Sequence, residues 1–179
     1  MIETFTSKIS DEVFYLIQDT EIKIRGRYLR FSANVEGLMV KCTVLINEVK
    51  LKRSGTEIHI NFKNFMFRQK LKKLQSLLLE IFPDLSQSYA ILFGHIDTFR
   101  EMRNKMAHCY FQWDDKDLNS VLIWDSDEKS ATQIMEPSKY LLNDINNSLT
   151  QSMKNIMYDL NKLTEEVTQR TKSEVPYMF

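Results

Sequence analysis

The stretch LNDINNSLTQSMKNIMYDLNKLTEEV, Leu142–Val167, decides the fold class of this chain. Its apolar residues are separated by three, four, four, three, four, three and four positions: Leu142, Ile145, Leu149, Met153, Ile156, Leu160, Leu163 and Val167. This spacing places them on one face of a helix as a heptad-like seam. Such a seam is typical of a helix that packs in a bundle or binds a partner helix.

The first third of the chain shows the same periodicity. Ser10 and Asp11 offer an N-cap, and apolar residues from Tyr28 to Val49 recur mostly at intervals of three and four. We therefore expect one long N-terminal helix, or two nearly collinear ones, that ends near Ser54 and Gly55. Gly26 and Gly37 are points at which this helix could bend.

The middle of the chain predicts two further helices and a small β element. A helix follows the connector Ile58–Asn64 and ends before Pro83, because proline cannot continue it. Ser86 or Ser88 can cap the next helix. Val121–Trp124 and Thr132–Met135 flank Asp125–Ser130 as the strands of a hairpin.

Together these patterns predict an all-α, up-down helical bundle with a β-hairpin insertion near 120–136. We expect a single domain over residues 1–179, with its core at about 10–170 and a loosely ordered tail at 171–179.

Composition narrows the function classes. The 24 Lys and Arg balance 24 Asp and Glu, so no global attraction to nucleic acid is expected. The two cysteines, Cys42 and Cys109, form neither a disulfide framework nor a zinc pattern, which favours a reducing, cytoplasmic compartment. Neither a signal peptide nor an apolar run that could span a membrane is recognisable. We expect no cofactor and no metal: Asp114, Asp115 and Asp117 lack the glycine turn and distal glutamate of a calcium loop.

The hexapeptide Arg103-Asn104-Lys105-Met106-Ala107-His108 is the candidate functional motif. A guanidinium, a carboxamide and an imidazole are the groups needed to bind and cleave a phosphodiester without a metal. At about 100° per residue, Arg103 and His108 lie roughly 140° apart on a straight helix, whereas Asn104 and His108 share a face with Arg100. Either Arg103 curls around the helix, or the helix distorts, or a second chain completes the site. A twofold dimer would bring two arginines and two histidines to one cleft.

The motif and its context resemble the HEPN superfamily of helical domains, whose signature is an arginine, a polar residue, three further residues and a histidine. The resemblance covers roughly residues 25–170 and includes the long helix and the order of the later ones. It implies a metal-independent endoribonuclease, often the toxin of a toxin–antitoxin or anti-phage system, that works as a homodimer on an RNA substrate. Arg103 and His108 would then be catalytic, with Asn104 as the polar companion. Arg100 is not part of the family signature; its place one turn before Asn104 makes it a candidate auxiliary phosphate binder. The RNA 2′-hydroxyl would attack the adjacent phosphate and leave a 2′,3′-cyclic phosphate.

Tyr110 extends the resemblance to HepT toxins, in which the histidine is followed by one residue and a tyrosine. In those toxins a partner nucleotidyltransferase adenylylates the tyrosine and silences the nuclease. The alternative is that Tyr110 packs with Phe111 and Trp113 at the end of the helix.

Two other hypotheses remain open. The chain could be a catalytically inactive HEPN module that binds a protein partner or a nucleotide, with the Leu142–Val167 seam as its contact surface. It could also be an unrelated helical protein that carries the motif by chance.

Overall fold

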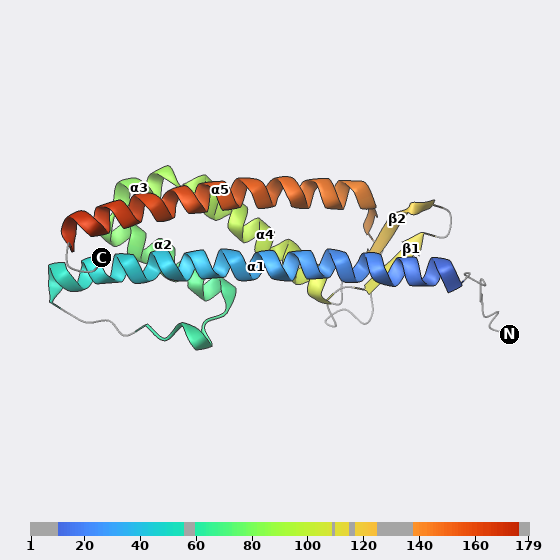
Figure 1. Ribbon diagram of the computed structural model, residues 1–179, viewed down its shortest axis with the longest axis horizontal. Coiled ribbons are helices and arrows are strands. Elements are labelled where there is room, and N and C mark those ends of the chain that lie inside the picture. The colour runs from blue at the N-terminus through green and yellow to red at the C-terminus, as the bar shows by residue number, and fades with distance from the viewer. Residues whose placement is uncertain (1–10, 56–59, 109, 115–116, 125–137, 176–179) are drawn as a thin grey trace, which may run out of the picture.

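The computed structural model describes residues 11–55, 60–108, 110–114, 117–124 and 138–175, and it is predominantly helical, which confirms the all-α class (Figure 1). Its helices are α1 (Asp11–Ser54), the short 3₁₀ helix η1 (Phe62–Asn64), α2 (Phe67–Ile81), α3 (Pro83–Ser88), α4 (Ala90–His108) and α5 (Leu142–Glu174). Its strands are β1 (Tyr110–Asp114), β2 (Asp117–Trp124) and β3 (Ser138–Leu141).

Helices α1 and α5 lie side by side and run in the same direction (Figure 1). Two contacts at different heights fix their register: Cys42 meets Thr164, 122 positions later, and Arg53 meets Glu174, 121 positions later. The heptad-like seam of α5 therefore meets an equivalent seam on α1. Both seams are buried. Their buried residues are Ile24, Tyr28, Phe31, Val35, Met39, Cys42, Ile46 and Val49 on α1, and Ile145, Leu149, Ile156, Leu160, Leu163 and Val167 on α5.

Helix α2 packs along the same long helix, also in its direction. Lys70 pairs with Glu36 near the start of α2, and Lys50 pairs with Glu80 near its end. Helix α4 then returns across the bundle toward the beginning of α1 (Figure 1). The expected up-down alternation is therefore wrong: α1, α2 and α5 run one way, and α4 runs the other. The alternation fails because the connector after α1 returns along it before α2 begins.

The helix ends follow local chemistry. Gly55, with φ 65°, adopts the left-handed conformation that ends many helices, and its N–H donates to the carbonyl of Leu51 at 2.8 Å. Pro83 is the first residue of α3, where its missing N–H and fixed φ cost nothing. Ser86 and Ser88 lie inside α3, so neither caps α4 as expected. Gly26 and Gly37 lie within a continuous α1.

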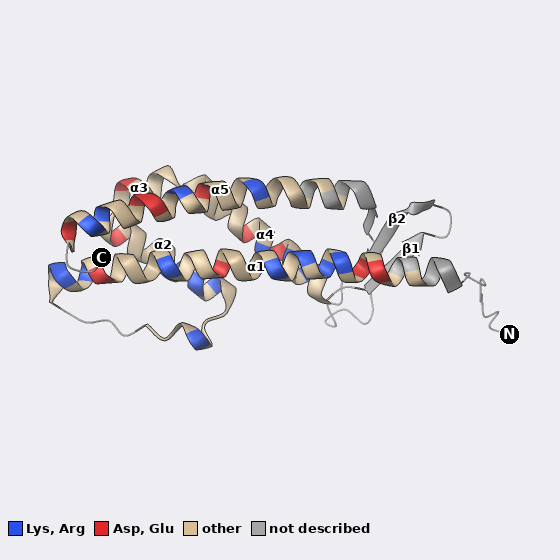
Figure 2. Cartoon of the chain, viewed as in Figure 1, with Lys and Arg blue, Asp and Glu red and all other residues tan. Residues whose placement is uncertain are grey.

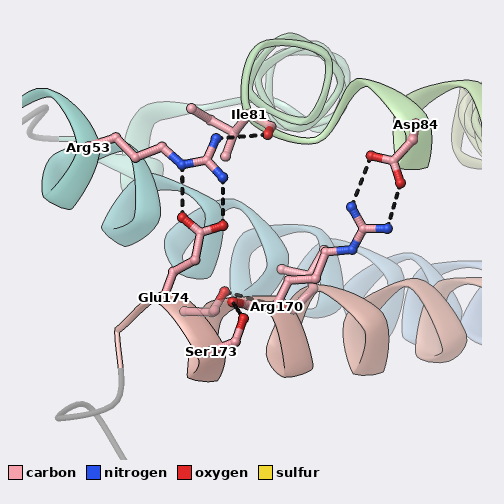
Figure 3. A network of polar contacts seen from close by, with 8 residues as sticks. Arg53, Ile81, Asp84, Arg170, Ser173 and Glu174 are labelled. Carbon is pink, nitrogen blue, oxygen red and sulfur yellow. Dashed lines mark hydrogen bonds and ion pairs between the residues drawn. The ribbon is translucent and has the colours of Figure 1, made fainter.

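Two arginines join the far ends of α1 and α5 to the α2–α3 junction (Figure 3). Arg53 makes a two-pronged ion pair with Glu174 and donates to the carbonyl of Ile81 at 3.1 Å. Arg170 makes a similar pair with Asp84 and holds the pKa of that carboxyl below its usual range. Both guanidinium groups lie over the buried ring of Phe82, at 5.6 and 5.4 Å from its centroid.

This arrangement corrects the expected tail. Residues 171–174 are the last turn of α5, Thr171 is fully buried, and Glu174 is anchored by Arg53. The helix continues because its last turn has a buried residue and a cationic partner that lies 121 positions earlier in the chain.

The β element also differs from the expected hairpin. Strand β2 lies between β1 and β3 in a three-stranded antiparallel sheet, with Phe111 opposite Ile123 and Val121 opposite Tyr140. Val121–Trp124 therefore pairs with β1 and β3. The second expected strand, Thr132–Met135, lies outside the described residues, so the hairpin near 120–136 is not supported.

Replacing Phe82 measures how much the α2–α3 junction contributes to the free energy of unfolding. Phe82→Ala removes a fully buried ring and the surface over which two guanidinium groups lie, so the free energy of unfolding should fall by about 3–5 kcal/mol. Urea denaturation measures this change. The control is Leu79→Ala in α2, a side chain that is 63% exposed and should change stability by less than about 0.5 kcal/mol. Equal effects of the two substitutions would contradict this account.

The buried thiol of Cys42 should react slowly in the folded protein. Burial raises the pKa of its thiol to about 11, against a hydrogen bond with Thr164 that lowers it. In a Cys109→Ser background, the folded protein should therefore react with a thiol reagent at pH 8 far more slowly than the urea-unfolded chain. The thiol's contribution to stability is present below pH 9.0, the ordinary value, and should be lost as the pH rises toward 11. Equal labelling rates in folded and unfolded protein would refute the burial of Cys42.

Candidate functional site

The candidate motif occupies the last two turns of α4, where this helix reaches the N-terminal half of α1 (Figure 2). Two aromatic contacts bring the helices together: the Phe99 ring stacks on Tyr28 at 5.8 Å and meets Phe31 edge-on at 4.7 Å. Phe99 lies four residues before Arg103, so both project from the side of α4 that faces α1.

Arg25 of α1 closes the end of the motif helix. Its Nη1 donates to the carbonyl oxygens of Met106 and Ala107 at 2.8 and 3.1 Å, where α4 has no further turn to satisfy them. Glu21, one turn earlier on α1, binds the same guanidinium at 2.7 Å. The sequence motif gives no sign of this contact, because Arg25 comes from a helix 81 positions earlier. It fixes the turn that carries His108.

Arg103 occupies a position where the pattern of α4 calls for an apolar residue. The buried residues of this helix are Leu92, Phe93, Ile96, Phe99 and Met106, and the series 92, 96, 99, 103, 106 has helical spacing. The Arg103 side chain is accordingly half-buried, and its Nε is fully buried without a hydrogen-bond partner among the described residues. Its Nη1 donates to Oδ1 of Asn104 at 3.0 Å.

A groove of about 450 Å³ lies beside this arginine. Arg103 lines it together with Lys70 of α2 and residues of α1: Leu29, Ser32, Ala33, Glu36, Gly37 and Val40. Glu36 could neutralise Arg103, but its carboxylate is held by Lys70 at 2.5 Å. Arg103 therefore faces an open groove with its own neighbour's amide as its hydrogen-bond partner. Neither Lys70 nor Glu36 could be assigned to the site from the motif.

His108 and Arg100 differ from Arg103 in their exposure and in their partners. His108 is exposed at the end of α4, and no hydrogen bond joins it to Arg103 in the part of the chain that the structure describes. Arg100 binds the carboxylates of Asp97 and Glu101, and its guanidinium lowers the pKa of Asp97. A phosphate would have to compete with these carboxylates for Arg100. By helix geometry, the Arg103 and His108 side chains of one chain lie roughly 140° apart.

Tyr110 is the first residue of β1, opposite Trp124 in the sheet register. The two expectations for its side chain, a modification site or packing with Phe111 and Trp113, fall outside what the structure describes.

The structure does bear on the seam of Leu142–Val167. Its described members are mostly buried against α1, so it is not available as the contact surface of a partner helix. That form of the scaffold hypothesis is wrong.

A second hollow, of about 170 Å³, lies between α1, α4 and α5. Tyr28, Phe99 and Leu149 give it an apolar wall, and His95, Ser152 and Asn155 add polar groups. In the described ranges no three His, Cys, Asp or Glu side chains gather as a metal site requires. None of the helices described combines the length and apolar character needed to cross a bilayer.

Comparisons with known proteins assign no family. No family model matches the chain, and neither a curated protein nor a solved structure matches it.

The half-buried position of Arg103 predicts an unusual effect on stability. Arg103→Met keeps an unbranched stem and removes a buried donor without a partner, so the free energy of unfolding should rise by about 1 kcal/mol. Arg100→Met is the control on the same helix, and it should lower stability slightly, because it breaks two ion pairs. Thermal or urea denaturation measures both variants. If Arg103→Met lost more stability than Arg100→Met, Arg103 would be a structural residue.

Proposed function

We propose that this chain is a metal-independent endoribonuclease of the HEPN type, with Arg103 and His108 as its catalytic residues. The observation that supports this most is Arg103 itself. A cation placed in an apolar stripe, with a buried Nε that has no partner among the described residues, costs stability. Arg53 and Arg170 meet carboxylates in the same protein, whereas Arg103 faces an open groove. An arginine kept at such a cost is a candidate functional residue.

The chemistry follows from the groups present. A phosphodiester in the groove would receive donors from the Arg103 guanidinium, which offsets the negative charge that grows on the non-bridging oxygens. Lys70 lines the same groove, but its charge is offset by Glu36, with which it forms an ion pair. Asn104 binds Nη1 of Arg103 and orients the guanidinium.

His108 supplies the proton transfer. As general base, its imidazole would take the proton of the ribose 2′-hydroxyl, and the oxygen would then attack the adjacent phosphorus. The bond to the 5′-oxygen of the next nucleotide breaks, and that oxygen takes up a proton. The products are a 2′,3′-cyclic phosphate and a 5′-hydroxyl end. DNA lacks the 2′-hydroxyl and would not be cleaved.

The proposal requires two copies of the chain. Arg103 faces the groove beside α1 while His108 is exposed at the helix end, so the imidazole of one copy and the guanidinium of the other would act on one linkage. The resemblance alone adds a toxin or anti-phage role to this proposal. In that role, an antitoxin, or a nucleotidyltransferase that modifies Tyr110, would silence the nuclease.

The second candidate function is a catalytically inactive module that binds a nucleotide. The hollow between α1, α4 and α5 favours it: at about 170 Å³ it would admit part of a nucleotide, with His95, Ser152 and Asn155 as its polar groups. In that case RNA would remain intact, and variants at Arg103 and His108 would behave as the wild type.

Cleavage of labelled RNA in the presence of EDTA tests the nuclease. His108→Ala and Arg103→Ala should each reduce the rate by at least about 100-fold, because each removes a group that acts on the transition state. The wild-type products should carry 2′,3′-cyclic phosphate ends, which mass spectrometry identifies. His95→Ala is the matched control: it removes an exposed histidine from the same helix and should cleave normally. Cleavage that persists in the two motif variants would come from a contaminant and would end the proposal.

A further inference from the structure

Helix α1 has an exposed apolar stripe in addition to its buried seam. It consists of Ile22, Gly26, Leu29, Ala33, Gly37, Val40 and Val44, and we call it the α1 stripe; all are exposed except Val40, which is half-buried. At about 100° per residue, all seven positions lie within roughly 40° of the line through Ala33. Ile22 is 68% exposed, Leu29 49% and Val44 42%. The stripe extends for roughly 33 Å at 1.5 Å per residue.

The spacing of the residues in the α1 stripe is the same in both directions. The intervals are four, three and four on each side of Ala33. If a second α1 packs antiparallel with the twofold axis at Ala33, Leu29 meets Gly37 and Val40 meets Gly26, while Ile22 meets Val44. Each glycine of the stripe thus faces a branched side chain, and Ala33 faces its own copy. A surface that fits itself in this way suits an interface between two identical chains.

The two glycines point to the same conclusion. A glycine inside a helix costs about 1 kcal/mol relative to alanine, so it usually has a packing reason. A Cβ added at Gly26 or Gly37 would meet no atom within 4 Å in this chain. Neither glycine is required by packing within the described part of the monomer. Gly94 in α4 is equally open, so open surroundings alone do not indicate an interface. Gly26 and Gly37 differ from it because they lie in the symmetric stripe, where a second helix could approach closely.

We propose that the α1 stripe binds the α1 stripe of a second copy, antiparallel, with the twofold axis at Ala33. An axis that reverses the helix direction keeps each flank of the stripe on its own side of the dimer. Glu36 lies roughly 60° to one side of the stripe and Arg30 roughly 60° to the other. The groove that contains Glu36 and Arg103 therefore lies beside the same groove of the partner copy. Ala33 itself lines that groove, so both Arg103 side chains come close to the axis.

The proposed interface is inferred from the stripe and its glycines, and it does not depend on nuclease activity. The proposed nuclease requires a second copy of the motif, and this interface would place one on the same side of the molecule. Cleavage assays on the same samples keep the two proposals separate. A wild-type dimer that cleaves no RNA supports the interface and removes the nuclease.

Sedimentation velocity on the full chain tests the interface. The wild type should sediment with twice the mass of 21.3 kDa. Ala33→Arg places two like charges at the axis and should weaken the dimer on the order of 100-fold or more. Asn34→Arg adds the same charge at the next exposed position, roughly 100° around the helix, and should remain dimeric. Far-UV circular dichroism should be unchanged in both. A monomeric wild type, or equal behaviour of the two variants, would overturn the proposal.

The register has its own test. Gly37→Leu fills the space proposed for Leu29 of the second copy and should dissociate the dimer, while Gly94→Leu in α4 changes a helical glycine with equally open surroundings and should not. In a Cys109→Ser background, Ala33→Cys should form a disulfide-linked dimer on mild oxidation, because the axis brings the two thiols together. Asn34→Cys should not crosslink. Crosslinking that is no faster at position 33 than at 34 would overturn the register.

Discussion

The parallel alignment of α1 with α5 is the constraint on which the rest of the structure depends. Partners 121 and 122 positions apart, Arg53 with Glu174 and Cys42 with Thr164, fix the same register at two heights. Two parallel neighbours cannot be joined by a short turn, so the intervening chain must return the length of the bundle. Helix α4 makes that return. It delivers the motif to the N-terminal half of α1, far from the end that Arg53 and Arg170 hold together.

Local sequence patterns predicted the helices well because each depends on chemistry within a few residues. The apolar periodicity located α1 and α5, Gly55 ended the first, and Pro83 stopped α2. Helix directions depend on contacts between distant segments, which periodicity does not encode, and the expected up-down order was therefore wrong. The same limit applies to the tail. Residues 171–174 are helical through Arg53 and a buried Thr171, neither of which makes the local sequence look helical.

The candidate site was a prediction from the hexapeptide and from helix geometry, which set Arg103 and His108 roughly 140° apart. Its surroundings could not be predicted in the same way. Arg25, Glu36 and Lys70 come from elsewhere in the chain, and no local signal links them to the motif. One signal was available in the sequence: the series 92, 96, 99, 103, 106 places Arg103 where the core needs an apolar residue. That misfit between pattern and residue type separates Arg103 from the arginines that merely join helices.

The proposed nuclease and the proposed interface impose conditions on each other. Two Arg103 side chains near one axis repel, and Glu36 cannot neutralise them fully while it is held by Lys70. A phosphodiester between the two copies removes this repulsion and gives each guanidinium an acceptor. By linkage, a ligand that binds the dimer better than the monomer favours assembly. The buried Nε of Arg103, which costs stability in the isolated chain, would then belong to a site that is complete only with both copies and the substrate phosphate present.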